Sequence, residues 1–169
     1  MIKIEFLTGE ILELNLTSFV GANLSGMNLR KALLCAKDMR EAKIQGADLR
    51  SAFFRNSDLS EADLSSSDMI IADFSMSDLQ NANLQNAVLI SAQFHNADLR
   101  NADLSGSDLE DAIFRDTNIQ GTNFTDCVDI DKADFQGAVY SEDTIFPLHF
   151  DPRQAGAIFI ANNFLFCRQ

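Results

Sequence analysis

A large apolar residue recurs at every fifth position over most of this 169-residue chain. The series begins at Leu24, and its members are Leu24, Leu29, Leu34, Met39, Ile44, Leu49, Phe54, Leu59, Leu64, Met69, Phe74, Leu79, Leu84, Leu89, Phe94, Leu99, Leu104, Leu109, Phe114, Ile119 and Phe124. Five residues rotate a side chain by roughly 140° about an α-helix and place it on the opposite face of a β-strand. Neither element buries such a series on one side, so the period requires another architecture.

A small residue stands two positions before almost every member of the series, and Asp or Asn usually lies between the two. Residues two apart share one side of an extended segment. Each unit of five therefore predicts a short extended piece with a large and a small residue pointing inward, followed by a corner. Successive pieces form coils, and stacked coils bury a continuous core as in a solenoid.

The phenylalanines indicate how many sides one coil has. Phe54, Phe74, Phe94 and Phe114 are 20 residues apart, which is four units of five, so a four-sided coil stacks their rings in one column. Coils about 4.8 Å apart suit such stacking. After Phe124 the frame shifts by one residue within DCVDID (126–131), and Phe135 then returns to the same column.

These repeats resemble a known family. GADLR (46–50), EADLS (61–65), NANLQ (81–85) and NADLS (101–105) are similar to the A(D/N)LXX unit of the pentapeptide repeat family, over about residues 17–140. The resemblance implies an all-β fold, a right-handed quadrilateral parallel β-helix. Met27 and Lys37 depart from the pattern because a small residue is expected there. We expect a distorted coil at Lys37, or a lysine stem that extends to solvent.

The sequence predicts three parts, because an open coil exposes its core and needs a cap at each end. Residues 1–16 alternate as a capping hairpin or first irregular coil, 17–140 form the β-helix, and 141–169 leave the repeat as a C-terminal cap. Asp151 and Pro152 predict a helix start in this last part. Its segment from Thr144 to Gly156 is similar to the tail of cyanobacterial members. The chain is expected to be a monomer or a homodimer through the apolar tail residues Ile158, Phe159, Ile160, Phe164, Leu165 and Phe166.

Charge and composition limit the partners. The net charge is -12 and the pI is about 4.3, which argues against direct binding to nucleic acid or to an anionic membrane. The N-terminus lacks the pattern of a signal peptide, and no stretch has the length of a membrane span, so a cytoplasmic protein is expected. Cys35, Cys127 and Cys167 follow no CxxC spacing and fit a reducing compartment. A Cys127–Cys167 disulfide is an open alternative.

The sequence predicts no enzyme activity, no cofactor and no metal site. It contains two histidines, no G-x-G-x-x-G motif and no P-loop. The acidic stretch at 126–134 lacks the glycine and the terminal glutamate of an EF-hand loop. A non-catalytic protein-binding scaffold with a partner of unknown identity is therefore the leading prediction.

One candidate site is an aspartate ladder that the 20-residue coil places along one side: Asp38, Asp58, Asp78 and Asp98. These carboxylates either accept backbone N–H bonds at the corners or imitate DNA phosphates. The family resemblance implies the second role, because some pentapeptide repeat proteins bind DNA gyrase or topoisomerase IV as DNA mimics. About 5.5 coils make a rod of about 26 Å, so the net charge is about one per 2.2 Å, against one per 1.7 Å in DNA. Arginines interrupt this surface.

The other candidate site is an isoleucine patch, defined as Ile70, Ile71, Val88 and Ile90. The pattern places all four outward on two adjacent coils, where other coils carry polar residues. Contiguous exposed apolar residues are typical of a contact surface. Either a protein partner or the cap and a loose segment of this chain covers the patch. Leu33 and Phe53 also point outward, and we expect the N-terminal segment to cover them.

Overall fold

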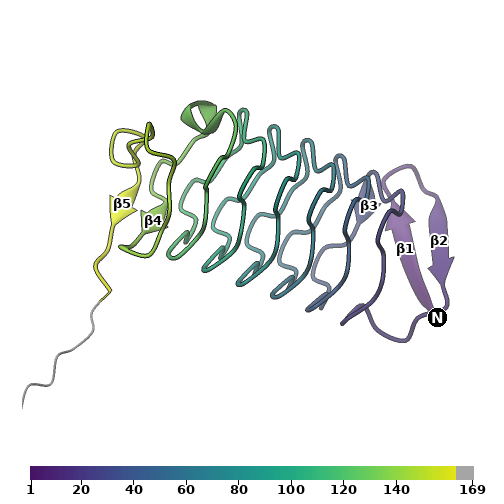
Figure 1. The fold of residues 1–169 in the computed structure, drawn as a ribbon. Coiled ribbons are helices and arrows are strands. Elements are labelled where there is room, and N and C mark those ends of the chain that lie inside the picture. Colours follow the sequence, from purple (N-terminus) through teal and green to yellow (C-terminus); the bar gives the residue numbers. More distant parts are fainter. Residues whose placement is uncertain (163–169) are drawn as a thin grey trace, which may run out of the picture.

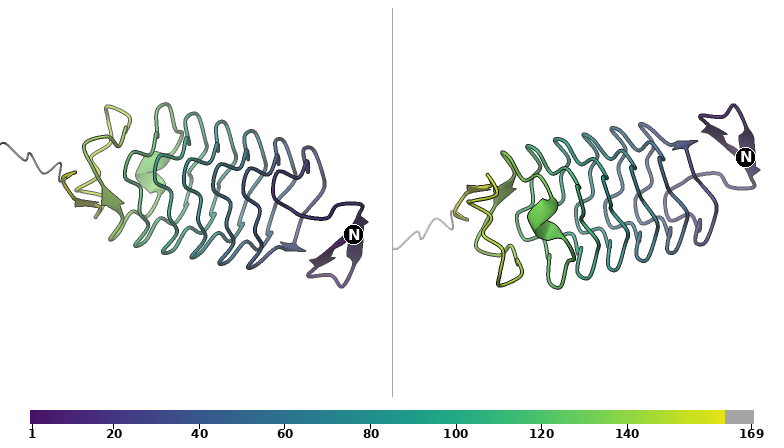
Figure 2. Two further views of the ribbon diagram at one scale, coloured as in Figure 1. Left: turned by 90° about the horizontal axis from the view of Figure 1, so that it is seen from below. Right: turned by 90° about the horizontal axis from the view of Figure 1, so that it is seen from above.

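The fold is a right-handed quadrilateral β-helix, seen in a computed structural model that describes residues 1–162. Parallel bridges join residues 20 apart in chain order, for example Asn28 to Asp48 and Asp48 to Asp68. The coils stack into a rod with the N-terminal hairpin at one end (Figures 1 and 2). Within residues 1–162 the one helix is the 3-10 turn η1 (Ile130–Lys132). No helix there has the length and apolar content of a bilayer-spanning segment.

Each corner of the coil has a left-handed backbone conformation. Most corner positions hold Gly, Asn, Asp or Ser, and Asn81 and Asn101 have φ values of 58° and 57°. Asparagine and glycine adopt this conformation at little cost. The Asp or Asn that precedes each buried central residue stabilises the corner that follows. Before Leu104, for example, the Asp103 carboxylate accepts the N–H of Ser105 at 2.9 Å. The Asp and Asn of the repeat therefore form the corners from which the extended sides start.

The core consists of stacked columns of the fifth-position residues. Every central residue from Leu24 to Phe124 is 0% exposed. In the phenylalanine column, Phe54, Phe74, Phe94, Phe114 and Phe135 stack with ring centroids 4.7 to 5.2 Å apart. The 20-residue coil and the return of Phe135 to this column are therefore confirmed.

A single inserted residue accounts for the shift of frame after Phe124. Asp108 pairs with Val128, 20 residues on, whereas Ile113 pairs with Asp134, 21 residues on. Between these rungs Asp129 has a φ of 53°, and η1 follows it. The extra residue is accommodated at a corner, so the stacking of the core continues beyond it.

The N-terminal end is closed by a hairpin. Strand β1 (Ile2–Phe6) pairs antiparallel with β2 (Ile11–Leu14) and with β3 (Ala32–Leu33) of the first coil (Figure 1). The hairpin packs Ile4, 1% exposed, against the open end of the core. Leu33 lies opposite Glu5 of β1 and is half-buried, as is Phe53 on the next rung. The N-terminal segment thus lies beside Leu33, as expected, whereas Phe53 pairs with Leu33 and Asp73 and has no bridge to that segment.

The coil at Lys37 is adjusted by one serine. Lys37 is exposed, as its alternative of a solvent-directed stem predicts. Its backbone N–H donates to Ser57 Oγ at 3.2 Å, and Ser57 Oγ donates to the Leu34 carbonyl at 2.7 Å. The equivalent N–H of Ala42 bonds directly to the Met39 carbonyl. Ser57 therefore bridges this turn, as Ser67 and Ser107 bridge the turns at Ala47 and Ala87.

The C-terminal cap differs from the expectation at one point, because no helix forms at Asp151. The Asp151 carboxylate accepts the N–H groups of Arg153 and Gln154, at 3.0 and 3.4 Å, as a helix cap does. Gly156, with a φ of +88°, then reverses the chain after one turn. This reversal lets β5 (Ile158–Phe159) pair in parallel with β4 (Val139–Tyr140). Phe164, Leu165, Phe166 and Cys167 lie outside the described residues, and with them the tail contact and the disulfide.

Candidate protein-binding surface

The isoleucine patch lies on the side of the β-helix built on the central residues Leu29, Leu49, Met69, Leu89 and Leu109, which we call the patch side. Val88 bridges in parallel to Asp68, and the N–H of Ile71 donates to the Ile90 carbonyl at 2.9 Å. Ile71 is 54% exposed, and Ile70, Val88 and Ile90 are half-buried. The structure therefore brings the four predicted residues together on two neighbouring coils, and no segment within residues 1–162 covers Ile71.

Ile71 occupies a left-handed corner, with a φ of 59°. It is the one β-branched residue at a positive φ within residues 1–162. A β-branched side chain is a rare outlier there, because its Cβ substituents crowd the backbone. Met76, 62% exposed and at a φ of 60°, holds the next corner. The patch thus combines exposed apolar area with backbone strain, and the sequence signal for this strain is an isoleucine where the neighbouring coils hold Ser51 and Ser91.

Ion pairs border the isoleucine patch at both ends. On one coil Arg50 contacts Asp48 at 2.5 Å and Asp68 at 3.4 Å. The hydrogen bond from Arg50 lowers the pKa of Asp48 from its ordinary value, and burial opposes this in part. On the opposite border the Lys132 ammonium contacts Glu110 at 2.8 Å. The apolar centre is therefore surrounded by a polar rim, as in many protein interfaces.

The aspartate ladder forms on a different side, where Asp38, Asp58, Asp78 and Asp98 follow one another through parallel bridges. Each carboxylate accepts the backbone N–H two residues later. The donors are Arg40, Ser60, Gln80 and Arg100, at 3.4, 3.0, 2.9 and 3.1 Å. The backbone role expected for these aspartates is therefore present.

Two arginines reduce the charge of the aspartate ladder. Arg40 contacts Asp38 at 2.8 Å and lies 3.7 Å from Asp58. Arg100 contacts Asp98 at 2.6 Å. Asp78 accepts the Gln80 side-chain amide at 3.0 Å, and no guanidinium within residues 1–162 lies within ion-pair distance of it. A surface that imitates phosphates needs unpaired anions, so Asp78 is the ladder's best candidate, followed by Asp58 with its longer contact to Arg40.

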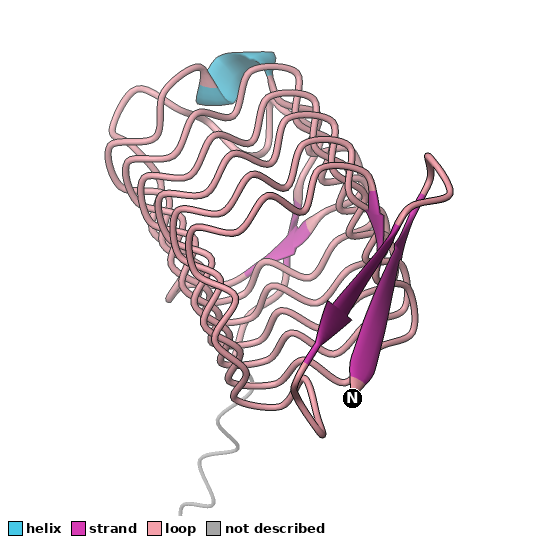
Figure 3. Cartoon of the chain, turned by 90° about the vertical axis from the view of Figure 1, so that its right-hand side faces the viewer, coloured by secondary structure: helices cyan, strands magenta, loops and turns pink. Residues whose placement is uncertain are grey.

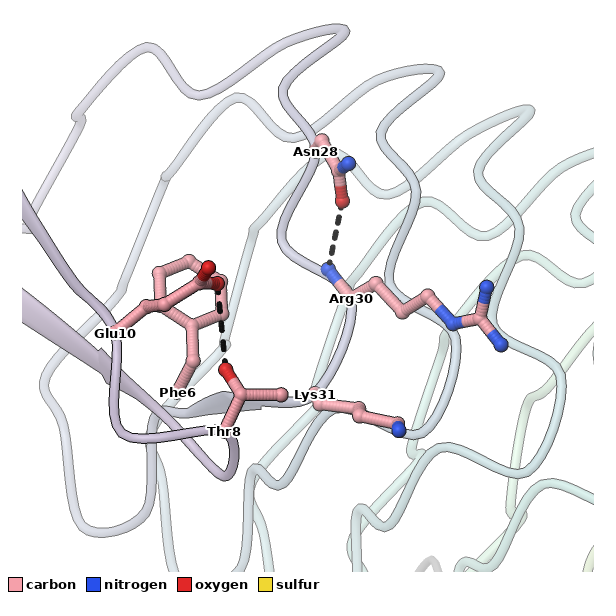
Figure 4. A pocket seen from close by; sticks show the side chains of 6 residues that line it. All are labelled: Phe6, Thr8, Glu10, Asn28, Arg30 and Lys31. Carbon is pink, nitrogen blue, oxygen red and sulfur yellow. Dashed lines mark hydrogen bonds between the residues drawn. The ribbon is translucent and has the colours of Figure 1, made fainter.

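A pocket of about 490 Å³ lies at the N-terminal end of the patch side. Phe6, Thr8 and Glu10 of the hairpin line it together with Asn28, Arg30 and Lys31 of the first coil (Figure 4). In this view the Arg30 and Lys31 side chains extend in parallel, away from the hairpin. The pocket was not predicted, because it exists only where the hairpin crosses the coil. No group of three or more His, Cys, Asp or Glu side chains within residues 1–162 is arranged to hold a metal ion.

A model of pentapeptide repeats matches the chain in eight copies over residues 17–56, 38–75, 71–106 and 92–128. No curated protein matches the chain by sequence.

Three solved structures illustrate the likeness. HetL from the cyanobacterium Nostoc sp. strain PCC 7120, a protein involved in heterocyst differentiation regulation, is 23% identical over 85% of this chain and 65% of its own, with a TM-score of 0.38. Rfr23 from the cyanobacterium Cyanothece 51142 is 25% identical over 76% and 90%, with a TM-score of 0.29. Full-length QnrB1, a plasmid-mediated fluoroquinolone resistance protein, is 16% identical over 86% and 91%, with a TM-score of 0.38. With repeats matched over most of its length and a four-sided β-helix built from them, the chain belongs to the pentapeptide repeat family.

Proposed function

We propose that this chain is a non-catalytic scaffold that binds a protein partner through the patch side. The observation that carries the proposal is the isoleucine patch, with four branched aliphatic residues on two coils and Ile71 exposed in a strained conformation. Repeats whose backbone bonds run from coil to coil present such a surface without rearrangement. Preorganisation of this kind favours binding because little conformational entropy is lost.

The energetics of Ile71 support a contact in a complex. A left-handed conformation costs an ordinary residue about 1–2 kcal/mol, and an exposed side chain regains little of this by burial. The equivalent corners on other coils hold Lys31, Ser51, Ser91 and Asp111, and none of these is β-branched. Backbone strain and exposed apolar area that persist together indicate a functional constraint. A partner that buries Ile71 supplies the compensating free energy.

The test replaces the patch with residues that the chain already uses at the same place. Gln45, Gln80 and Gln85 occupy the equivalent outward position on other sides, so Ile70→Gln/Ile90→Gln keeps the fold. We expect this variant to lose the proteins that the wild-type chain captures from an extract of cells that make it. The control Ser60→Gln/Ser65→Gln changes the equivalent outward positions on two other sides, and we expect it to retain the captured proteins. Unchanged capture by the patch variant contradicts the proposal. A cytoplasmic extract is the appropriate source, because sparse cysteines are typical of proteins in reducing compartments.

The alternative function is DNA mimicry towards gyrase or topoisomerase IV through the aspartate ladder. The net charge of -12 and the unpaired Asp78 favour it. A gyrase supercoiling assay tests it, and mimicry predicts inhibition that weakens with salt because screening reduces charge contacts. Asp58→Asn/Asp78→Asn then abolishes the inhibition, while Asp63→Asn/Asp103→Asn on another side preserves it. Absence of inhibition at micromolar protein rejects this alternative.

A further inference from the structure

We propose that the partner bound by the patch side is a second copy of this chain, held in an antiparallel two-fold dimer. The proposal rests on the proposed function and names the occupant of the same surface. In the dimer Ile70 of each copy lies opposite Ile90 of the other. Three independent features support this arrangement: the order of residues along the patch side, the distribution of charge along the rod, and the shape of its two ends.

The outward column of the patch side changes in character along the axis. Its members in chain order are Arg30, Arg50, Ile70, Ile90 and Glu110. Backbone hydrogen bonds between neighbouring coils hold these residues in this order along the axis. The carbonyls of Arg50, Ile70, Ile90 and Glu110 each accept an N–H from the preceding coil at 2.8 to 2.9 Å. η1 continues the column, because Lys132 of η1 contacts Glu110 at 2.8 Å, and Asp131 is exposed on this turn. The column therefore runs from two arginines, of which Arg50 is paired with Asp48, through an apolar centre to Glu110 and Asp131, of which Glu110 is paired with Lys132.

A two-fold axis between Ile70 and Ile90, perpendicular to the rod, makes this column complementary to itself. The axis reverses the order of the coils and keeps each column opposite its own copy. Arg50 then lies opposite Glu110, and Arg30 opposite the turn that carries Asp131. An isologous interface requires this self-complementarity. A parallel arrangement instead places arginine against arginine, and like charges across an interface are strongly unfavourable.

The charge distribution of the whole rod favours the same arrangement. Residues 17–60 contain seven Lys or Arg and four Asp or Glu, whereas residues 101–151 contain two Lys or Arg and twelve Asp or Glu. Because the coils stack in chain order, this difference becomes a difference between the two ends of the molecule. Antiparallel packing sets the basic coils of one copy beside the acidic coils of the other. With a Debye length of about 8 Å at physiological salt, these contacts act while charges on distant sides are screened.

The two ends of the patch side also differ in shape. η1 stands out from a corner near the C-terminal end of the rod (Figures 1 and 3). The pocket with Arg30 and Lys31 lies at the N-terminal end (Figure 4). Antiparallel packing brings η1 of one copy to this pocket of the other. Arg30 has no ion pair within residues 1–162, and Asp131 contacts His149 at 3.4 Å. Arg30 is therefore available to a second copy, and the exposed Asp131 can exchange its His149 contact for one in the dimer.

The dimer is expected to be weak. Six coils at about 4.8 Å make a contact of about 24 Å in length and one side in width, below the standard interface of about 800 Å² per partner. The dimer also places Asp48 of one copy opposite Asp108 of the other, and these like charges weaken it. Arg50, which is bound to Asp48, reduces this repulsion. An affinity in the micromolar range is therefore expected.

Sedimentation equilibrium across the micromolar range, with reciprocal charge changes, tests the proposal. Arg30→Glu and Asp131→Arg each create a repulsive pair twice in the dimer, so each lowers the association constant about tenfold. An equimolar mixture of the two variants restores attraction at both pairs and recovers wild-type association. Ile70→Gln/Ile90→Gln abolishes it. The control pair, Lys37→Glu and Asp116→Arg, changes the same charges away from the patch side and leaves association unchanged.

Disulfide cross-linking tests the register. In a background of Cys35→Ser and Cys167→Ser, Ile70→Cys and Ile90→Cys chains are mixed and oxidised. The antiparallel dimer yields a 70–90 cross-link in the mixture and little 70–70 or 90–90 product from the single variants. Predominant 70–70 product overturns the antiparallel arrangement.

The outcomes separate this inference from the proposed function. A wild-type chain that stays monomeric, or a mixture that recovers no association, overturns the second copy as the partner. If Ile70→Gln/Ile90→Gln still loses a captured protein in that case, the patch side binds a different protein and the proposed function stands. If capture is also unaffected, both are wrong.

Discussion

At the scale of single residues, the exceptions to the five-residue pattern carry the most information. Ile71 places a β-branched side chain where the coil needs a left-handed corner. Lys37 places a long cation where it needs a small residue. Ile71 stays exposed within residues 1–162, whereas the Lys37 side chain lies in solvent and its backbone N–H is bonded to Ser57. A strained position without a compensating contact marks a candidate binding residue.

We expect Ile71→Asn to stabilise the protein. Asparagine accepts the left-handed conformation, and the half-exposed isoleucine loses little burial, so the free energy of unfolding rises by about 1 kcal/mol. Thermal unfolding measures this as an increase in Tm of about 2–4 °C. The same change weakens binding at the patch side. Ser91→Asn, on the next coil of the same column, gives a smaller change in Tm, and a lower Tm for Ile71→Asn contradicts the strain argument.

At the scale of the coil, the sequence predicts the features that set or shift the five-residue frame and misses those that depend on long-range contacts. The period of five, the four sides and the inserted residue before Phe135 follow from the positions of large and small residues. The prediction of a helix at Asp151 was wrong. The Asp151 cap is a local interaction, whereas Gly156 and the pairing of β5 with β4 end the turn that follows it. The pocket beside Arg30 depends on where the hairpin crosses the first coil. Long-range contacts of this kind leave no periodic signal.

The bridge at Ser57 gives a prediction for a single coil. Ser57→Ala leaves the Lys37 N–H and the Leu34 carbonyl without their partner, so we expect a loss of about 2 kcal/mol in unfolding free energy. Ser77→Ala is the matched control on the next rung, because Ser77 Oγ donates only to the nearby Phe74 carbonyl. Urea unfolding compares the two variants. Equal losses show that Ser57 does not bridge the coils.

At the scale of the whole molecule, carboxylates bonded to backbone N–H groups and arginines link stability to pH. The pKa values of Asp38, Asp48, Asp73, Asp103 and Asp134 are lowered from their ordinary value. At Asp73 burial acts in the opposite direction, and the hydrogen bonds from Ser75 together with Arg55 outweigh it. A lowered pKa in the folded state adds stability above the unfolded value, and this stability is lost as the pH falls through the folded value.

The unfolding free energy is therefore expected to stay level from neutral pH to about pH 5 and to fall below about pH 4. Urea unfolding at a series of pH values measures this. Asp73→Asn lowers stability at neutral pH by about 1–3 kcal/mol and makes the acid-dependent loss shallower. Asp126→Asn, at an exposed corner, leaves the curve unchanged. A curve that rises towards low pH contradicts the role of these carboxylates.

The bridges between residues 20 apart have a consequence for how such a protein lengthens during evolution. A duplication of 20 residues adds one coil and leaves every later residue on its own side, so it extends a binding surface without rearranging it. A duplication of five moves all later residues by a quarter turn and mixes the surfaces. The single residue inserted before Phe135 was absorbed at a corner instead, which left both the core and the surfaces in place. Selection on the patch side therefore favours changes of length in whole coils, and it tolerates irregular insertions at corners.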